Sequence, residues 1–525
     1  MTPAQVLSEA NTLERVLPTT RYYPLRHMAP YPVKGGTSWQ NDGQNFVFDP
    51  YSGLWRTWAL GNPDWKPADG FPQTSWIEYA GPALDQMVPL GVRLDRADYS
   101  ADIYTSGSVF VDWHNKLGRG HGAAWYFVAT LSAEHLQALM LLTAPALGTT
   151  PHVQGIVIPN DAVPPDQRGP GLDLRDCRVF WDDAHDQLVL SATCGAKFIF
   201  FASTDGFNWR YLSTLAGPGP LVECPNMLQV PLHDANGSPT GKTRWVILGA
   251  VQGTWSGATD SFECCAVWVG NWDGTTFTPD AGYPLPVDYG PDSYASTTGT
   301  DHLGRPFMGY WLGNWEYCTR VMPFEGFQNI QGLPRQCWLQ PDSSGVVRLF
   351  SAPLETDLDA YSTSYAGSHQ TLDSTTAYAW PNQAIPTGKC ARVDITLERI
   401  GESWPETITL QLRAGTVNGQ SFHTDLTVNG TTGTVILDRS KAGSEGPAAP
   451  VPASWTRPYT MPASLGVTSG KTITLSVLLD SCSVEAFING GLGSMAALIF
   501  PPDTCQGLSL TASGTVSATA TIHHY

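Results

Sequence analysis

The chain has 525 residues, a formal net charge of −18, 14% charged residues and 19 tryptophans. This length exceeds one ordinary hydrophobic core and predicts two domains. Because the sequence has no run rich in Lys or Arg, it argues against nucleic-acid binding and against binding to anionic membranes. No apolar run approaches the roughly 20 residues that span a bilayer, so we expect no membrane association.

Residues 1–20 are predicted to form an N-terminal extension, with a helix over residues 4–16. They lack the charged start and apolar stretch of a signal peptide. The acidic, Trp-rich and Lys-poor composition nevertheless favours an extracellular or periplasmic (secreted) protein. A second helix is predicted over residues 132–142, because Ser132 can cap its N-terminus and Glu134 lies in its first turn.

Residues 21–352 are predicted to form a β-propeller. Short apolar or alternating runs, such as residues 124–128 and 244–248, are separated by Asp-Gly, Asn-Gly and Pro-Gly turns. About twenty short strands are too many for one sandwich but fit five four-stranded blades of about 66 residues each. The 52 glycines and 41 prolines agree with an all-β chain of many tight turns.

Residues 353–525 are predicted to form a β-sandwich. Residues 390–413 and 471–489 alternate between apolar and polar side chains, which is the pattern of half-buried strands. The ten cysteines include no Cys-x-x-Cys pair, so a zinc site is not expected. Their even number permits disulfides but does not establish them.

Three acidic residues lie in short polar breaks between apolar runs. Asp42 follows Trp39 in a turn-rich segment, Asp176 follows Arg175, and Glu223 precedes Cys-Pro. Enzymes that cleave glycosidic bonds need a nucleophile, a proton donor and often an anchoring acid. We therefore expect an active site assembled from distant parts of the chain.

The motifs around these acids resemble those of glycoside hydrolase family 32, which contains invertases, inulinases, levanases and related fructosyltransferases. That family carries Trp-Met-Asn-Asp-Pro-Asn-Gly, Arg-Asp-Pro and Glu-Cys-Pro, where this chain has Trp39–Asn45, Arg175–Cys177 and Glu223–Pro225 in the same order. The resemblance covers nearly the whole chain. It implies a catalytic five-bladed β-propeller followed by a β-sandwich, a fructoside substrate, and no metal or organic cofactor. Supporting matches are Tyr104–Ser108, Asp288–Ala295, Trp311–Trp315, Pro334–Gln336 and Asp480–Gly490.

The resemblance also implies a role for each acid in a retaining mechanism. Asp42 would be the nucleophile, Asp176 the transition-state stabiliser and Glu223 the general acid/base. Asp has the lower intrinsic pKa, which suits an ionised nucleophile. We expect Arg175 to keep Asp176 ionised, and the apolar neighbours of Glu223 to favour its protonated form. The expected substrate-binding residues are Trp39, Asn41, Gln44, Trp76, Ser106, Arg175 and Trp311, and His27 is expected to be a structural hydrogen-bonding residue.

The chain departs from the family pattern around the expected nucleophile and stabiliser. Gly43 stands in place of a Pro, Gln44 in place of an Asn, and Cys177 in place of a second Pro. Pro fixes φ, so both loops should be less constrained here. Leu60 replaces a Gln, which should remove a hydrogen bond near the nucleophile.

Several alternatives remain open from the residues. A fructosyltransferase of the same fold would make fructo-oligosaccharides or, by intramolecular transfer, a difructose anhydride. A carbohydrate-binding protein without turnover would keep the tryptophans but would not need all three acids. A propeller glycosidase of another family, such as one acting on arabinofuranosides, is a further alternative. The sequence does not distinguish sucrose, inulin and levan, and it assigns no oligomeric state.

Overall fold

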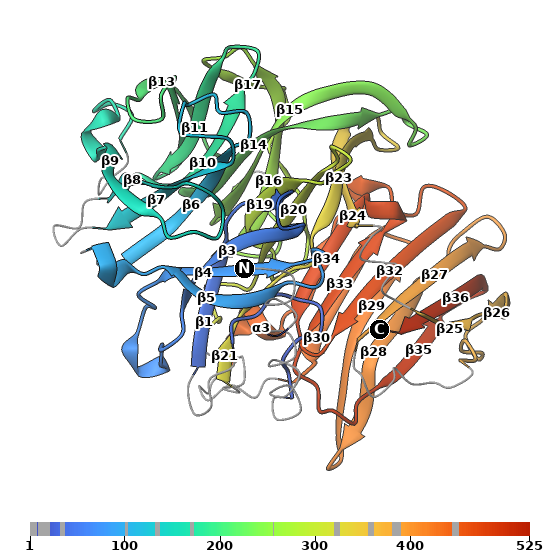
Figure 1. Cartoon of the computed structure of the whole chain (residues 1–525). Helices are drawn as coiled ribbons and strands as arrows, with labels where there is room; N and C mark the ends of the chain where they lie inside the picture. Colours follow the sequence, from blue (N-terminus) through green and yellow to red (C-terminus); the bar gives the residue numbers. More distant parts are fainter. Residues whose placement is uncertain are drawn as a thin grey trace.

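The protein is built almost entirely of β-strands (Figure 1). The expected all-β fold is confirmed: five blades form a propeller, and two further sheets form a β-sandwich beside it. The helix predicted over residues 4–16 lies, apart from residue 8, outside the described residues, and the domain boundaries at residues 20 and 352 stay predictions. The computed structural model describes residues 8, 21–31, 37–99, 103–131, 137–168, 173–255, 257–319, 326–354, 362–380, 390–443 and 451–524.

The first three blades each consist of four antiparallel strands in chain order. In the first blade, the short strand β2 (Val47–Asp49) also pairs with β3. The strands are β1 (Thr37–Gly43), β3 (Leu54–Asn62), β4 (Ser75–Gly81) and β5 (Val88–Leu94) in blade 1. They are β6 (Ile103–Asp112), β7 (Ala123–Leu131), β8 (Gln137–Ala144) and β9 (His152–Ile158) in blade 2. Blade 3 has β10 (Arg175–Asp182), β11 (Gln187–Cys194), β12 (Lys197–Ser203) and β13 (Arg210–Ala216).

Blades 4 and 5 are joined into one sheet by a parallel bridge between Leu232 and Leu339. Blade 4 has β14 (Leu221–His233), β15 (Pro239–Gln252), β16 (Glu263–Trp272), β17 (Phe277–Pro279) and the short β18 (Leu285–Pro286). Blade 5 has β19 (Tyr294–Thr300), β20 (Pro306–Leu312), β22 (Ile330–Gln331), β23 (Arg335–Pro341) and β24 (Val347–Pro353). The strand β21 (Gly326–Gln328) lies between β20 and β22 in the chain. It pairs in parallel with β1 of blade 1, which closes the ring.

Of residues 132–142, for which the sequence predicts a helix, the structure describes those from Gln137 onward. They form the strand β8, so the prediction is wrong there. Leu139 and Leu141 pack toward blade 3, whereas Met140 and Leu142 pack toward blade 1. Both faces of this strand are buried, so its sequence is a continuous apolar run without visible alternation. Such a run cannot be assigned to helix or strand by periodicity.

The sandwich packs two antiparallel sheets around its own apolar core. The predicted alternation is observed in β27, where Val393, Ile395 and Leu397 are buried and the residues between them are partly exposed. One sheet has β25 (Ser362–Ala366), β26 (Gln370–Leu372), β36 (Val516–His524), β27 (Ala391–Arg399), β32 (Thr472–Asp480), β33 (Ser483–Ile488) and β34 (Gly493–Leu498). The other has β31 (Tyr459–Met461), β30 (Val435–Lys441), β29 (Gln420–Asn429), β28 (Thr407–Val417) and β35 (Gly507–Ala512), and the short helix α3 (Ala453–Thr456) precedes β31.

Buried charges fasten the propeller to the sandwich. His27 Nδ1 lies 2.9 Å from Asp480 Oδ2, and His27 Nε2 lies 2.7 Å from Glu485 Oε1. Arg335 of blade 5 binds Glu485 at 3.1 Å and Asp288 at 2.8 Å. The structural role predicted for His27 is confirmed. Several of the supporting sequence motifs therefore build the domain interface and lie away from the three acids.

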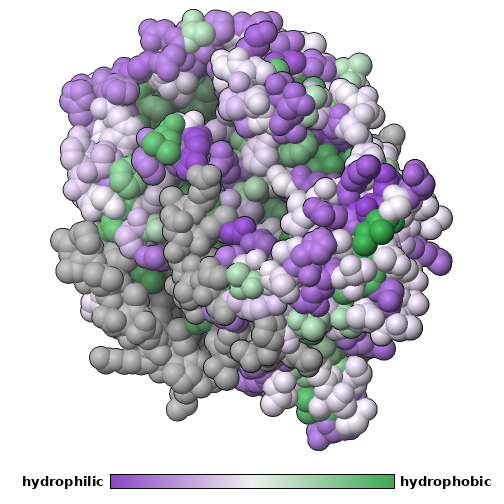
Figure 2. Space-filling view, turned by 90° about the vertical axis from the view of Figure 1, so that its right-hand side faces the viewer, coloured by the Kyte–Doolittle hydropathy of each residue, from purple (hydrophilic) through white to green (hydrophobic). Residues whose placement is uncertain are grey.

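The outer surface is mostly polar. On the face shown in Figure 2, hydrophilic residues predominate and hydrophobic residues form small separate groups. No helix among the described residues is long and apolar enough to cross a membrane.

Candidate active site

The channel-lining strand of every blade carries a β-bulge. Between Tyr104 and Gly107, for example, β6 advances three residues while β7 advances only two, from Thr130 to Val128. Bulges redirect side chains and are frequent beside active sites. The other four shifts lie at Gln40/Gly43, Arg175/Arg178, Glu223/Asn226 and Tyr294/Thr297.

The three predicted acids lie in or at these bulges and meet in space. Asp176 has a φ of 56°, and Cys224, which follows Glu223, has a φ of 49°. Asp42 contacts the segment after Glu223, since Cys224 Sγ lies 3.9 Å from Asp42 Oδ2. Arg175 reaches both Asp176 and Glu223. The irregular backbone thus turns acids from three blades toward one point.

Asp42 is held by two hydrogen bonds. Ser106 Oγ donates to Asp42 Oδ2 at 2.9 Å, and Asn41 Nδ2 donates to Oδ1 at 3.1 Å. Burial and the negative charge of Glu223 raise the pKa of Asp42 to about 6, although these hydrogen bonds and the charge of Arg178 oppose the rise. Our expectation that an Asp here keeps its low intrinsic pKa is therefore wrong, because burial outweighs these favourable contacts.

Arg175 is shared among three carboxylates. Its guanidinium lies 2.8 Å from Asp173, 2.9 Å from Glu223 and 3.5 Å from Asp176. Burial raises the pKa of Asp176 to about 8; Arg175 opposes this rise, whereas the charges of Glu223 and Asp42 add to it. The expectation that Arg175 keeps Asp176 ionised is wrong, because burial, together with the charges of Glu223 and Asp42, outweighs the effect of the guanidinium.

Glu223 lies among polar groups, which corrects the apolar setting expected from its sequence neighbours. Tyr294 Oη donates to Glu223 Oε2 at 2.5 Å, and Arg175 Nη2 lies 2.9 Å from Oε1. Gln252 Nε2 is 3.4 Å from Oε2. Val222 is a neighbour in sequence, but a strand turns successive side chains to opposite faces, so its buried side chain points away from that of Glu223.

A fourth acid, Glu263 on β16, was missed by the sequence analysis. It is 1% exposed, accepts a hydrogen bond from the backbone N–H of Trp315 at 3.1 Å, and lies 3.5 Å from Gln252 Nε2. Burial raises its pKa well above the ordinary value. The available signal was a single carboxyl at the start of the apolar run Cys264–Val269, which is unusual unless the acid has partners.

The three tryptophans expected to bind substrate have no exposed surface. Trp76 belongs to the core of blades 1 and 2 and donates to the Thr105 carbonyl at 3.2 Å. Trp39 and Trp311 lie beneath Trp315, with ring centroids 6.1 and 4.8 Å from it. These residues therefore support the site from below and do not present a ring face to a ligand.

The aromatic surface beside the acids comes from two residues that the sequence analysis did not select. Trp315 is half-buried, and its ring stacks with that of Phe71 at a centroid distance of 5.6 Å. Phe71 is 63% exposed. An exposed aromatic face can pack against the apolar face of a sugar.

Gln44 is also structural. It is fully buried, its Oε1 accepts from the Gly107 N–H at 2.7 Å, and its Nε2 donates to the Asp42 carbonyl at 3.0 Å. Leu60 is buried with Trp76 in the apolar core of blades 1 and 2. Of the expected substrate-binding residues, Asn41 and Ser106 bind Asp42 directly, and Arg175 keeps some exposed surface, 12% of its side chain.

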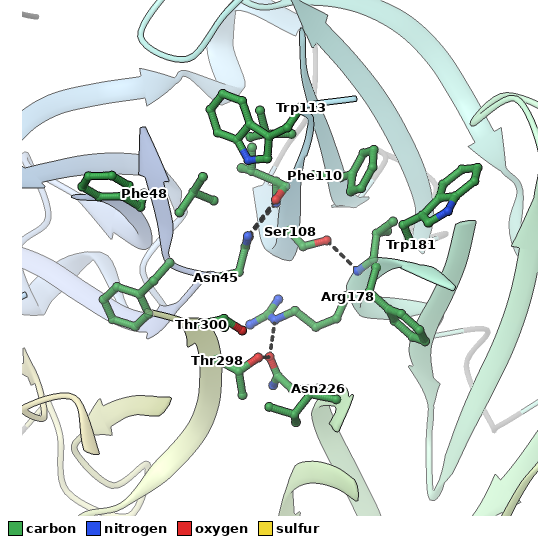
Figure 3. A pocket seen from close by; sticks show the side chains of 18 of the residues that line it. Asn45, Phe48, Ser108, Phe110, Trp113, Arg178, Trp181, Asn226, Thr298 and Thr300 are labelled. Carbon is green, nitrogen blue, oxygen red and sulfur yellow. Dashed lines mark hydrogen bonds between the residues drawn. The ribbon is translucent and has the colours of Figure 1, made fainter. Parts of the chain in front are cut away.

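On the other side of the bulges, the channel widens into a cavity of about 560 Å³ (Figure 3). All five blades contribute to its lining, with Asn45, Ser108, Arg178, Asn226 and Thr298 at its inner end. Half-buried rings, among them those of Trp113 and Trp181, line it further out. Within the described ranges, no group of three or more His, Cys, Asp or Glu side chains is arranged to hold a metal ion.

Two family models match this chain. Residues 33–353 match the N-terminal domain of glycosyl hydrolases family 32, and residues 357–525 match the C-terminal region of that family. The levanbiose-producing levanase of Bacillus subtilis (strain 168) is 24% identical over 514 residues, covering 95% of this chain and 91% of that protein. The extracellular exo-inulinase inuE of Aspergillus niger is 26% identical over 529 residues, covering 91% of this chain and 90% of that protein.

Solved structures show the same fold. The exo-inulinase of Aspergillus awamori superposes with a TM-score of 0.77 at 22% identity, over 96% of this chain and 98% of that one. The β-fructofuranosidase of Schwanniomyces occidentalis, complexed with fructosyl-erythritol, gives a TM-score of 0.78 at 17% identity, over 95% and 97% of the two chains.

Proposed function

This chain belongs to glycosyl hydrolase family 32 and is a glycosidase of the β-fructofuranosidase or fructanase type; from that premise we propose that it hydrolyses the β-fructofuranosidic bonds of sucrose or fructans with retention of configuration. The observation that carries the proposal is the meeting of Asp42, Asp176 and Glu223, whose charges act on one another, with Arg175 between Asp176 and Glu223. A retaining glycosidase needs a nucleophilic carboxylate and a second carboxyl that acts as acid and then as base.

In the first step, Asp42 attacks the anomeric carbon of the fructosyl unit while Glu223 gives a proton to the leaving oxygen. The bond to the leaving group breaks, and a fructosyl ester of Asp42 forms. In the second step, Glu223 takes a proton from water, the water oxygen attacks the anomeric carbon, and the ester bond breaks to release fructose and the Asp42 carboxylate. Asp176 holds sugar hydroxyls and stabilises the positive charge of the transition state.

The electrostatics of the site support this division of work. Burial and mutual repulsion raise the pKa of Asp42, Asp176 and Glu263, so this cluster of acids retains a proton near neutral pH, as a property of the coupled groups. Tyr294 and Arg175 fix the Glu223 carboxyl from two sides, so its position is set before substrate arrives.

The stacked pair of half-buried Trp315 and exposed Phe71 supports a substrate longer than a single sugar. Its rings lie at the outer side of the buried tryptophans, where the units beyond the cleaved bond would pass. We therefore propose fructans as substrates besides sucrose, and an extracellular or periplasmic location, where such polymers occur.

The test is sugar release from sucrose, inulin and levan by the purified protein, with Asp42→Ala and Glu223→Ala in parallel. We expect cleavage of at least one fructoside, and a loss of several orders of magnitude in kcat in both variants. Product analysis in concentrated sucrose separates hydrolysis from transfer, since longer oligosaccharides would indicate a fructosyltransferase. If the wild-type protein releases no sugar from sucrose, inulin or levan, the proposed function is wrong.

A further inference from the structure

Arg178 occupies the centre of the propeller directly below the acids. It lies on β10, two residues after Asp176, and is 5% exposed. Its guanidinium donates to the Gly43 carbonyl at 2.9 Å, and it also donates to the Gly107 carbonyl. Nε donates to Asn226 Oδ1 at 3.2 Å, a bond drawn in Figure 3. One side chain of blade 3 thus binds blades 1, 2 and 4.

Each of these contacts is next to a group of the candidate active site. Gly43 follows Asp42, and Gly107 follows Ser106, the hydroxyl donor to Asp42. Asn226 lies three residues after Glu223, and its Nδ2 donates to the Cys224 carbonyl at 2.9 Å. We propose that Arg178 is a positioning residue, which fixes the three acids relative to one another across four blades; this inference rests on the proposed function.

The bulges explain why such a residue is needed. At this level the bulged strands leave their regular pairing, so the ladder bonds that hold a blade together do not fix the acid-bearing segments. Gly43 and Cys177 stand where the family pattern has prolines, so neither restricts φ as a Pro would. A planar guanidinium with five fixed donors can hold several acceptors at once, which an ammonium group cannot do with the same geometry.

The contacts of Arg178 leave its charge available to the acids above. Its guanidinium donates to neutral oxygens, from the backbone of Gly43, Gly107 and Cys177 and the side chains of Gln44 and Asn226. The positive charge lowers the pKa of Asp42 and of Asp176, against the larger effect of burial. Position and charge can therefore be tested separately.

The first test compares Arg178→Lys with Arg178→Met. Lys keeps the charge but loses the fork of donors, and Met loses both. We expect kcat to fall about ten-fold in Arg178→Lys and about hundred-fold in Arg178→Met, with a smaller change in KM, because a displacement of about 1 Å costs on this order. The acid limb of the kcat/KM profile should move to higher pH in Arg178→Met and stay in place in Arg178→Lys.

The groups that face Asp42 are otherwise unchanged in both variants, so the shift isolates the charge of Arg178. They are Asn41, Ser106, Asp176, Glu223, Cys224 and Glu263. Arg413→Met is the matched control, because Arg413 is also fully buried and donates to a backbone carbonyl, that of Cys505, but lies in the sandwich. It should lower the melting temperature without moving the acid limb.

The cavity of Figure 3 permits a second test by chemical rescue. Arg178 lines this cavity, whereas Asp42, Asp176 and Glu223 do not. Guanidinium or methylguanidinium at millimolar concentration should raise kcat of Arg178→Ala several-fold, without competing with sucrose, and should not affect Arg413→Met. Two outcomes would overturn the proposal. The first is a wild-type kcat in Arg178→Lys. The second is a loss of kcat in Arg178→Met without a shift of the acid limb, together with no effect of guanidinium on Arg178→Ala. Inactivity of the wild-type protein on every fructoside would instead count against the proposed function.

Discussion

At the scale of single residues, the protonation of the site depends on several buried acids that lie close together. The raised pKa of Asp42, about 6, means that the nucleophile is increasingly protonated as pH falls below 6. A protonated carboxyl cannot attack, so we expect kcat/KM on sucrose to fall on the acid side with an apparent midpoint near that value. A pH–rate profile from pH 4 to 9 measures it, and activity constant down to pH 4 would contradict the burial argument.

The hydroxyl of Ser106 lowers the pKa of Asp42 by donating to its carboxylate. Ser106→Ala should therefore move the acid limb to higher pH and reduce kcat/KM at pH 5 by about ten-fold, as expected for a hydrogen bond to a charged group. Ser108→Ala is the matched control, because this hydroxyl accepts from the Val179 N–H on the other side of the strand. An equal shift in both variants would show that the effect is structural.

Tyr294 gives a third prediction at this scale. Tyr294→Phe removes the hydroxyl that donates to Glu223 at 2.5 Å, and the loss of one bond to a charged group should lower kcat about ten-fold. Tyr310→Phe removes a similar bond, to Glu485 at 2.5 Å in the domain interface. That variant should lower the melting temperature and leave kcat unchanged. Kinetics and thermal unfolding of both proteins separate the two effects.

At the scale of elements, the bulges require close approach of backbones, which Gly107 permits. A Cβ on Gly107 would lie 2.0 Å from the Phe127 carbonyl oxygen and 2.8 Å from the Trp76 ring. Backbone atoms cannot move aside as a flexible side chain can, so Gly107→Ala should destabilise the protein by about 3 kcal/mol, the upper part of the usual range for overpacking. Gly470→Ala, with no neighbour within 3.4 Å, is the control. If Gly107→Ala and the wild-type protein had equal unfolding midpoints in denaturant, this prediction would be wrong.

The sequence could predict the elements whose pattern is local. The alternation in residues 390–413 identified sandwich strands, and three polar breaks identified Asp42, Asp176 and Glu223. It could not predict β8, because a strand buried on both faces has no period. It also could not place Trp76 or Gln44 in the core. Every residue of β4 is buried, so no alternation marks Trp76, and the partners that bury Gln44, Gly107 and Arg178, are distant in the chain.

The partners of the acids were missed for a related reason. Tyr294, Glu263 and Arg178 each reach the site from a different blade, and their contacts with Glu223, Trp315 and Gly43 join residues 52 to 135 positions apart in the chain. No local spacing records such a contact. A carboxyl at the edge of an apolar strand, as at Glu263, was the one available sign.

At the scale of the whole molecule, blade 5 is fixed to the sandwich by ionised groups without solvent. Burial alone would lower the pKa of His27, but its hydrogen bonds to Asp480 and Glu485 outweigh this and raise it to about 9. Burial would raise the pKa of Glu485, but the hydrogen bond from His27 and the charge of Arg335 lower it to about 2. The interface therefore contains a protonated His between two carboxylates over a wide pH range.

The sign of the resulting pH dependence follows from these shifts. The raised pKa of His27 contributes stability that is fully present below its unfolded value of about 6.5 and is lost as pH rises toward 9, by up to about 3 kcal/mol. The lowered pKa of Glu485 contributes stability that is present above about 4.5 and is lost as pH falls toward 2. These two groups together favour greatest stability between about pH 4.5 and 6.5.

His27→Gln tests this account. Because Gln does not titrate, the variant should be less stable at pH 6 but should lose less of its unfolding free energy between pH 6.5 and 9 than the wild-type protein. His185→Gln is the control, since His185 lies at the surface with 38% of its side chain exposed. Denaturant unfolding at four pH values measures the slopes. If wild type and His27→Gln show the same slope above pH 6.5, the interface does not contain a protonated His27, and the domains are joined by neutral hydrogen bonds instead.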